Sequence, residues 1–215
     1  MGILFSIMRT TSIPGDLKKR DSLLLSLLLF LLAKAVCLFG LASLLGLGLT
    51  PDEAQYWTWS QQLDWGYYSK PPAIAWQIWL GTHLFGNTEL GVRMVSGLFG
   101  IGLGLAVYRL AKLCQLREDV AFWSGLWMAI IPAGWLGSLL AITDVGLILF
   151  WTIGCQEVAD ALQKRRAISC MRLGGAVLVA ALFKWVAFLF WPLLVSFLLI
   201  YRKETRFMLG QPLIG

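Results

Sequence analysis

The 215-residue chain is poor in charged residues, which make up only 14% of it. A soluble domain carries about 25% charged residues, so the deficit argues against a water-facing shell over most of the surface. Hydrophobic residues make up 58% of the chain and gather in long runs. Several runs reach the roughly 20 residues that a membrane-spanning helix needs. We therefore predict an all-α, polytopic membrane protein.

Residues that commonly bind metals or form disulfides are also scarce. The chain has four Cys and one His, and none of the cysteines forms a CxxC or CxxH pair. This pattern supports neither a zinc site nor a disulfide framework. We therefore predict no metal ligands and no cofactor, with a divalent metal left open, and we interpret His83 as structural.

Positive charge is confined to the short segments between apolar runs. Although the net charge is +6, most basic residues fall in four clusters, at residues 9–20, 109–117, 164–172 and 202–206. Short basic segments mark the cytoplasmic side of a membrane protein. We therefore predict no nucleic-acid partner, a cytoplasmic N-terminus and a first loop on the extracytoplasmic face of the membrane.

The apolar runs divide the chain into a cytoplasmic tail at 1–21, a transmembrane domain at 22–206 and an incomplete tail at 207–215. The first run is too long for the apolar region of a cleavable signal, which is about 7–15 residues. Four spans are predicted, at residues 22–49, 90–111, 120–140 (with a break at Pro132) and 145–162. In the second of them, Gly100 and Gly104 form a GxxxG pair that suits close helix approach.

Residues 173–201 form a further apolar block that is compatible with two topologies. At 1.5 Å per residue, the block is too short for two full spans. A hairpin of two short helices that meet near Lys184 would keep both flanking basic clusters on one side. A single long span is the alternative, and we favour the hairpin because the charge rule otherwise fails at one cluster.

The first extracytoplasmic loop, residues 50–89, is rich in Trp and Tyr and predicts helices that lie in the membrane interface. Asp52 and Glu53 open this loop beside an apolar segment, where desolvation would raise the pKa of a carboxyl toward that of a general base. Lys70 precedes two prolines that favour an extended backbone, and could hold a lipid phosphate. The simpler interpretations are that Asp52 and Glu53 are solvated loop charges and that Lys70 extends its ammonium to the membrane interface.

Two further ionisable residues stand out among apolar neighbours. Asp144 opens the fourth predicted span, on the same side as Asp52. Lys184 lies in the middle of the last apolar block, and an intramembrane lysine is a functional hypothesis by default. Lys34, deep in the first span, fits no such group and is interpreted as structural or snorkelled.

Several of these residues belong to strings that resemble a known family. They are Asp52-Glu53-Ala54-x-Tyr56-Trp57, Leu63-Asp64-Trp65-Gly66-Tyr67-Tyr68, Lys70-Pro71-Pro72, Gly86-x-x-Glu89-Leu90-Gly91-Val92-Arg93, Thr143-Asp144 and Phe183-Lys184-Trp185. Together they resemble the N-terminal half of bacterial GT-C glycosyltransferases. The nearest branch is the dolichyl-/undecaprenyl-phosphate-mannose mannosyltransferase-like group (glycosyltransferase family 39), related to lipid A aminoarabinose transferases.

The resemblance implies transfer of a sugar from a polyprenyl-phosphate donor to an unidentified acceptor on the extracytoplasmic face. It implies that Asp52, with Glu53 beside it, is the catalytic base or orients the acceptor, and that Asp144 is the second acid. It also implies that Lys70 contacts the lipid phosphate. Many members carry an acid or histidine where Ser69 stands, which puts a metal-binding role there in doubt.

The chemistry suggests further substrate contacts beside those that the family implies. A leaving phosphate needs positive charge, for which Lys184 and Arg93 are further candidates. The aromatic loop suits stacking on a sugar and packing on isoprene, which makes Tyr67 and Tyr68 candidate substrate contacts.

Members of this family are usually longer, so the sequence is expected to be an N-terminal fragment or a short member. A partner chain that carries further spans would then be needed. The alternatives are a non-catalytic or truncated membrane module and a transporter of polyprenyl lipids.

Overall fold

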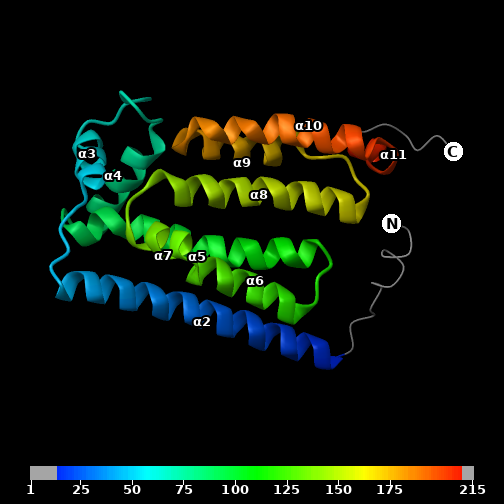
Figure 1. The fold of residues 1–215 in the computed structure, drawn as a ribbon, viewed down its shortest axis with the longest axis horizontal. Coiled ribbons are helices and arrows are strands. Elements are labelled where there is room, and N and C mark those ends of the chain that lie inside the picture. The colour runs from blue at the N-terminus through cyan, green and yellow to red at the C-terminus, as the bar shows by residue number, and fades with distance from the viewer. Residues whose placement is uncertain (1–13, 210–215) are drawn as a thin grey trace.

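The computed structural model describes residues 14–209, and all of their regular secondary structure is helical (Figure 1). The elements are α2 (Pro14–Leu44), α3 (Pro51–Ser60), α4 (Ala73–Phe85), α5 (Glu89–Leu113), α6 (Glu118–Ile130), α7 (Pro132–Leu139), α8 (Thr143–Lys164), α9 (Cys170–Phe183), η1 (Trp185–Leu189), α10 (Phe190–Ile200), α11 (Arg202–Thr205) and η2 (Arg206–Leu209). The longer helices run alongside one another, and α3 and α4 gather at one end of the bundle. The all-α prediction is confirmed.

Within the described residues, three helices are long and apolar enough to cross a membrane: residues 18–44 of α2, all of α5 and all of α8. A fourth candidate is the pair α6 and α7, whose axes differ by 63°. Large apolar side chains such as Leu25, Leu29 and Val36 are exposed along α2, as expected of a helix solvated by lipid. The chain is therefore a multi-pass membrane protein.

The first helix is shifted relative to the prediction, since it spans Pro14–Leu44 and not 22–49. At its start, the helix continues outward through Lys18, Lys19 and Arg20, which are exposed and are good helix formers. At its end, Gly46 adopts a φ of +59°, and the N–H of Leu47 bonds the carbonyl of Ala42 at 3.0 Å. This left-handed glycine closes the helix although the apolar run continues. Residues 1–13, which include Arg9 and most of the predicted tail, lie outside the described residues, as do residues 210–215.

The break predicted at Pro132 is confirmed, because α6 ends at Ile130 and α7 begins at Pro132. Lys34 of α2 reaches into this break. Its ammonium donates hydrogen bonds to the carbonyls of Ala129 (2.9 Å) and Gly134 (3.2 Å) and to the hydroxyl of Ser138 (2.9 Å). It binds carbonyl groups at the break in the helix, where backbone groups lose helical partners. The structural interpretation of Lys34 is therefore confirmed.

The predicted GxxxG pair lies where α5 meets its neighbours most closely. A Cβ atom at Gly100 would clash with the hydroxyl oxygen of Ser138 in α7. A Cβ atom at Gly104 would stand 2.9 Å from Leu31 in α2, and Gly125 of α6 faces Gly104 in the same way. The absence of side chains at these positions allows α5 to pack at the centre of the bundle.

The last apolar block is a hairpin, as we favoured. Helix α9 ends at Phe183, Lys184 is extended (φ −159°, ψ 130°), and η1 and α10 follow. The N–H of Ile168, just before α9, bonds the carbonyl of Met208 at 3.0 Å. The two ends of the block therefore lie together, and Lys184 stands near its turn.

The loop at 50–89 contains the two short helices α3 and α4, which pack on the start of α5. A buried cluster joins Tyr56 of α3, Ile74 and Ile78 of α4, Val92 of α5 and Ala141 before α8. This cluster fixes the loop to the same end of the bundle at which α8 begins. Residues at the starts of α3 and α8 are thereby brought together.

Candidate functional site

Asp52 lies in the first turn of α3 with its side chain exposed. Thr50 caps this helix, because its hydroxyl accepts a hydrogen bond from the N–H of Glu53 at 3.3 Å. In the described part of the chain, the Asp52 carboxylate makes no hydrogen bond or ion pair. It is therefore free to contact a substrate.

Glu53 differs from its neighbour, because it is fully buried and all its interactions are internal. Its carboxylate accepts two hydrogen bonds from Arg93, at 2.9 and 2.8 Å. It accepts two more from the backbone N–H groups of Thr50 (2.9 Å) and Ala141 (3.0 Å). Burial alone would raise the pKa of the Glu53 carboxyl, but these hydrogen bonds outweigh burial and lower the pKa. Glu53 is thus held as a carboxylate.

Arg93 extends this cluster to the end of α2. Besides Glu53, its guanidinium donates to the carbonyls of Leu47 (2.9 Å) and Gly48 (2.7 Å). The Glu53–Arg93 pair therefore joins the segment after α2, the start of α3, helix α5 and the segment before α8. Through Ala141, it fixes the position of Asp52 relative to Asp144.

Tyr56, one turn after Asp52, was not among the predicted site residues. It is 4% exposed, and burial raises the pKa of its hydroxyl. The negative charges of Asp52 and Asp144 raise that pKa further. The four-residue spacing of Asp52 and Tyr56 on one helix is the sequence signal that could have identified it.

Asp144 and Lys184 form an ion pair, with 2.8 Å between Oδ1 and Nζ. Asp144 lies in the first turn of α8, and Lys184 lies at the extended position between α9 and η1. Their side chains are 48% and 37% exposed, respectively. Both charged groups are therefore accessible, and such a half-exposed pair contributes only about 1 kcal/mol or less to stability.

The loop between α3 and α4 places the remaining predicted residues. Tyr68 is 99% exposed, and Lys70 is half-buried without a side-chain partner in the described part of the chain. Tyr67 is engaged inside the loop, because its ring stacks on Trp59 at 4.9 Å and its hydroxyl accepts from the N–H of Asp64 at 3.0 Å. Of the predicted site residues in this loop, Tyr68 and Lys70 are thus the ones available to a ligand.

Neither Asp52 nor Asp144 lines either of the two main cavities. One, of about 270 Å³, lies between α2 and α5 and includes Arg93; the other, of about 340 Å³, lies at the opposite end of the bundle. Asp52 and Asp144 instead border an open surface. Among the described residues, no group of three or more His, Cys, Asp or Glu could hold a metal. His83 contacts its own helix, with Nδ1 2.7 Å from the carbonyl of Trp79.

The arrangement suits displacement of a phosphate from a sugar. One unpaired carboxylate can accept the proton of an attacking hydroxyl, and accessible ammonium groups can stabilise the leaving phosphate. The site thus has two accessible acids at one end of the bundle, one with a lysine partner, and a second lysine on a neighbouring loop.

Comparison with known proteins agrees with this chemistry. Residues 69–214 match the family model of dolichyl-phosphate-mannose-protein mannosyltransferases. The chain is 36% identical over 135 residues to the lipid A galacturonosyltransferase RgtD of Rhizobium johnstonii, and 29% identical over 87 residues to an uncharacterized protein of Aquifex aeolicus.

These alignments cover 62% and 40% of the chain but only 28% and 21% of the two relatives, so the chain spans a minor part of their length. No solved structure matches the chain significantly. The family match includes Lys70, Arg93, Asp144 and Lys184 and begins after Asp52 and Glu53. Because it extends over more than half of the sequence, the chain belongs to the dolichyl-phosphate-mannose-protein mannosyltransferase family.

Proposed function

We propose that the chain forms the donor and acceptor site of a membrane glycosyltransferase that uses a polyprenyl-phosphate-linked sugar. The observation that carries this proposal is the pair of accessible acids, Asp52 and Asp144, at the end of the bundle that also bears Lys70 and Lys184. Family membership supports the same reaction class.

In the proposed reaction, an acceptor hydroxyl attacks the anomeric carbon of the donor sugar. The bond from that carbon to the phosphate oxygen breaks, and the polyprenyl phosphate leaves with the bonding electrons. Asp52 accepts the proton of the hydroxyl, since it has no other partner among the described residues. Proton transfer to a positioned carboxylate contributes about 10²–10⁴-fold to such reactions.

Lys70 and Lys184 stabilise the negative charge of the leaving phosphate. Lys70 is held by a turn in which the N–H of Tyr67 bonds its carbonyl at 3.0 Å, so its position is fixed although its ammonium is free. Lys184 can exchange Asp144 for a phosphate, which would release Asp144 to orient the acceptor. Tyr68, fully exposed beside Lys70, contacts the sugar or the first isoprene units.

Glu53 and Arg93 take positioning roles in this proposal. Both were candidates for direct contact with substrates, but their polar atoms are already engaged with each other and with the backbone. They fix the positions of Asp52 and Asp144 relative to each other. Tyr67 likewise supports the loop that carries Lys70.

The proposal includes an orientation in the bacterial inner membrane. Helices α3 and α4 face the extracytoplasmic side, and the basic segments at the other ends of the spans face the cytoplasm. The activity of the Rhizobium johnstonii relative makes a galacturonosyl donor and lipid A the first donor and acceptor to assay.

Replacing Lys70 with Ala tests the phosphate-holding role. A hydrogen bond between charged groups is worth about 1.5–3 kcal/mol, so KM for the polyprenyl-phosphate donor should rise roughly tenfold or more. Lys70→Arg keeps the charge and should stay within about threefold of the unchanged chain. Initial rates of sugar transfer, measured in membranes with equal amounts of each variant, give these constants. An unchanged KM in Lys70→Ala would remove Lys70 from the site.

A further inference from the structure

The cavity at the opposite end of the bundle lies between α5, α8 and α9 and has a volume of about 340 Å³. Small-molecule sites typically have about 300–1,000 Å³. No residue of the proposed transferase site lines it. It is therefore a separate candidate for a binding site.

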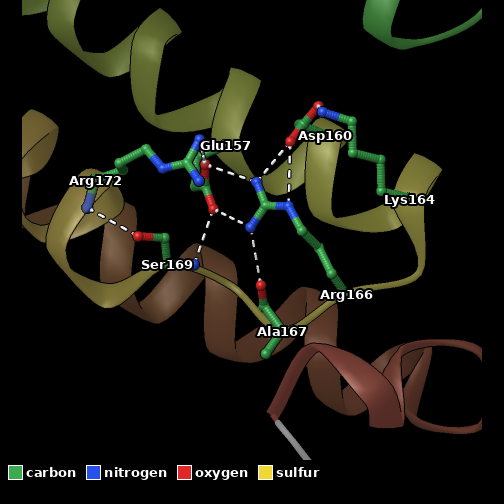
Figure 2. A network of polar contacts seen from close by, with 7 residues as sticks. All are labelled: Glu157, Asp160, Lys164, Arg166, Ala167, Ser169 and Arg172. Atoms are coloured by element: carbon green, nitrogen blue, oxygen red, sulfur yellow. Dashed lines mark hydrogen bonds and ion pairs between the residues drawn. The ribbon is translucent and has the colours of Figure 1, made fainter.

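Two acids that line the cavity, Glu157 and Asp160, already have partners, as Figure 2 shows. Arg166 bonds both carboxylate oxygens of Glu157, at 2.8 and 3.0 Å, and also bonds Asp160 at 2.5 Å. Lys164 pairs with Asp160 at 2.8 Å, and the N–H of Ser169 donates to Glu157 at 2.8 Å. The two carboxylates are thus neutralised before any ligand binds.

Two arginines that line the cavity remain as excess positive charge. Arg109 of α5 is exposed and has no carboxylate partner among the described residues. Arg172 of α9 is 68% exposed in its side chain and only reaches Glu157 at 3.7 Å. Since Glu157 already has Arg166, these two arginines leave the lining of the cavity with a net positive charge.

Apart from Gln156 and the charged residues, the lining of the cavity is apolar. The apolar part is formed by Phe150 and Ile153 of α8 and by Gly175, Ala176 and Val179 of α9. A Cβ atom at Gly175 would meet nothing within 4 Å, so the wall is open at this point. An anionic head group next to an apolar groove matches a lipid better than a soluble anion.

We propose that this cavity binds one anionic glycerophospholipid from the leaflet at that end of the bundle. The phosphate lies between Arg109 and Arg172, and an acyl chain lies along the apolar wall beside Gly175. Basic pockets between membrane helices recognise lipid head groups in this way. The inference does not depend on the transferase activity.

Native mass spectrometry of the full chain tests the head-group contacts. The chain is released from nanodiscs of mixed phosphatidylcholine and phosphatidylglycerol, and retained lipid is counted. Arg109→Gln/Arg172→Gln should lower retention of phosphatidylglycerol by about thirtyfold, from two lost basic contacts. Lys18→Gln/Lys19→Gln removes the same charge from exposed positions at the same end and should retain the lipid.

A pair of adjacent glycines tests the groove without a change of charge. Gly175→Leu would fill the wall and should lower retention by tenfold or more, whereas Gly174→Leu, which also meets nothing within 4 Å but does not line the cavity, should not. Equal retention by all four variants would overturn the proposal. The proposal would also be overturned if Lys18→Gln/Lys19→Gln lost as much phosphatidylglycerol as the arginine variant. It would be overturned too if the unchanged chain retained phosphatidylcholine as well as phosphatidylglycerol.

Discussion

Replacing Asp52 with Asn is expected to lower the rate of sugar transfer by about 10²–10⁴-fold, with little change in KM for the donor. The substitution keeps the shape of the side chain and removes its ability to accept a proton. The side chain has no partner to lose in the described part of the chain, so the fold should be unaffected. Initial rates in membranes, together with the midpoint of thermal unfolding in detergent, separate the two effects.

Glu89→Gln is the matched control for Asp52→Asn. Glu89 is also an exposed acid in the first turn of a helix, α5, on the segment that forms the same end of the bundle. It should keep transfer within about threefold of the unchanged chain, since a helix-terminal charge contributes only about 0.3–1 kcal/mol. Comparable activity in Asp52→Asn and Glu89→Gln would contradict the role of Asp52 as base.

Replacing Glu53 with Gln is expected to destabilise the chain by about 3–5 kcal/mol, because it leaves the buried Arg93 guanidinium without its counter-charge. The midpoint of thermal unfolding should fall on the order of 10 °C. Sugar transfer should fall as well, since Asp52 and Asp144 lose their common support. Differential scanning fluorimetry of the purified variants measures the first effect.

The contact between Glu53 and Arg93 makes the stability of the chain depend on pH. Because the pKa of Glu53 is lower in the folded chain than its ordinary 4.5, its contribution to stability is present above that value. The contribution is lost as pH falls through the folded pKa. The unchanged chain should therefore lose stability in acid more steeply than Glu53→Gln. The positioning role of Glu53 would be contradicted if the stability of both chains fell equally with pH, or if Glu53→Gln left the unfolding midpoint unchanged.

The sequence alone predicts the positions of the membrane-crossing helices well, because long apolar runs and Pro132 report directly on local structure. It also favours the hairpin around Lys184, through the placement of basic clusters. The end of α2 was missed, because the apolar run continues past Gly46 and only the backbone conformation of that glycine closes the helix.

The roles of the two adjacent acids were harder to separate from sequence. Thr50 and Glu53 have the spacing of a capping box, which indicates that Glu53 turns back toward its own helix. Asp52 is then left facing outward. The partners Arg93 and Ala141 lie 40 and 88 positions away, and no local pattern predicts such contacts.

The central claim is that a polyprenyl phosphate binds at the end of the bundle formed by α3, α4 and the starts of α8 and η1. Photo-crosslinking with a polyprenyl-phosphate analogue that carries its reactive group beside the phosphate tests it most directly, followed by peptide mapping of the labelled chain. The account predicts labels in residues 64–76, around Lys70, and in residues 183–190, around Lys184. Labels confined to the opposite end, around Arg109 and Arg172, would contradict it.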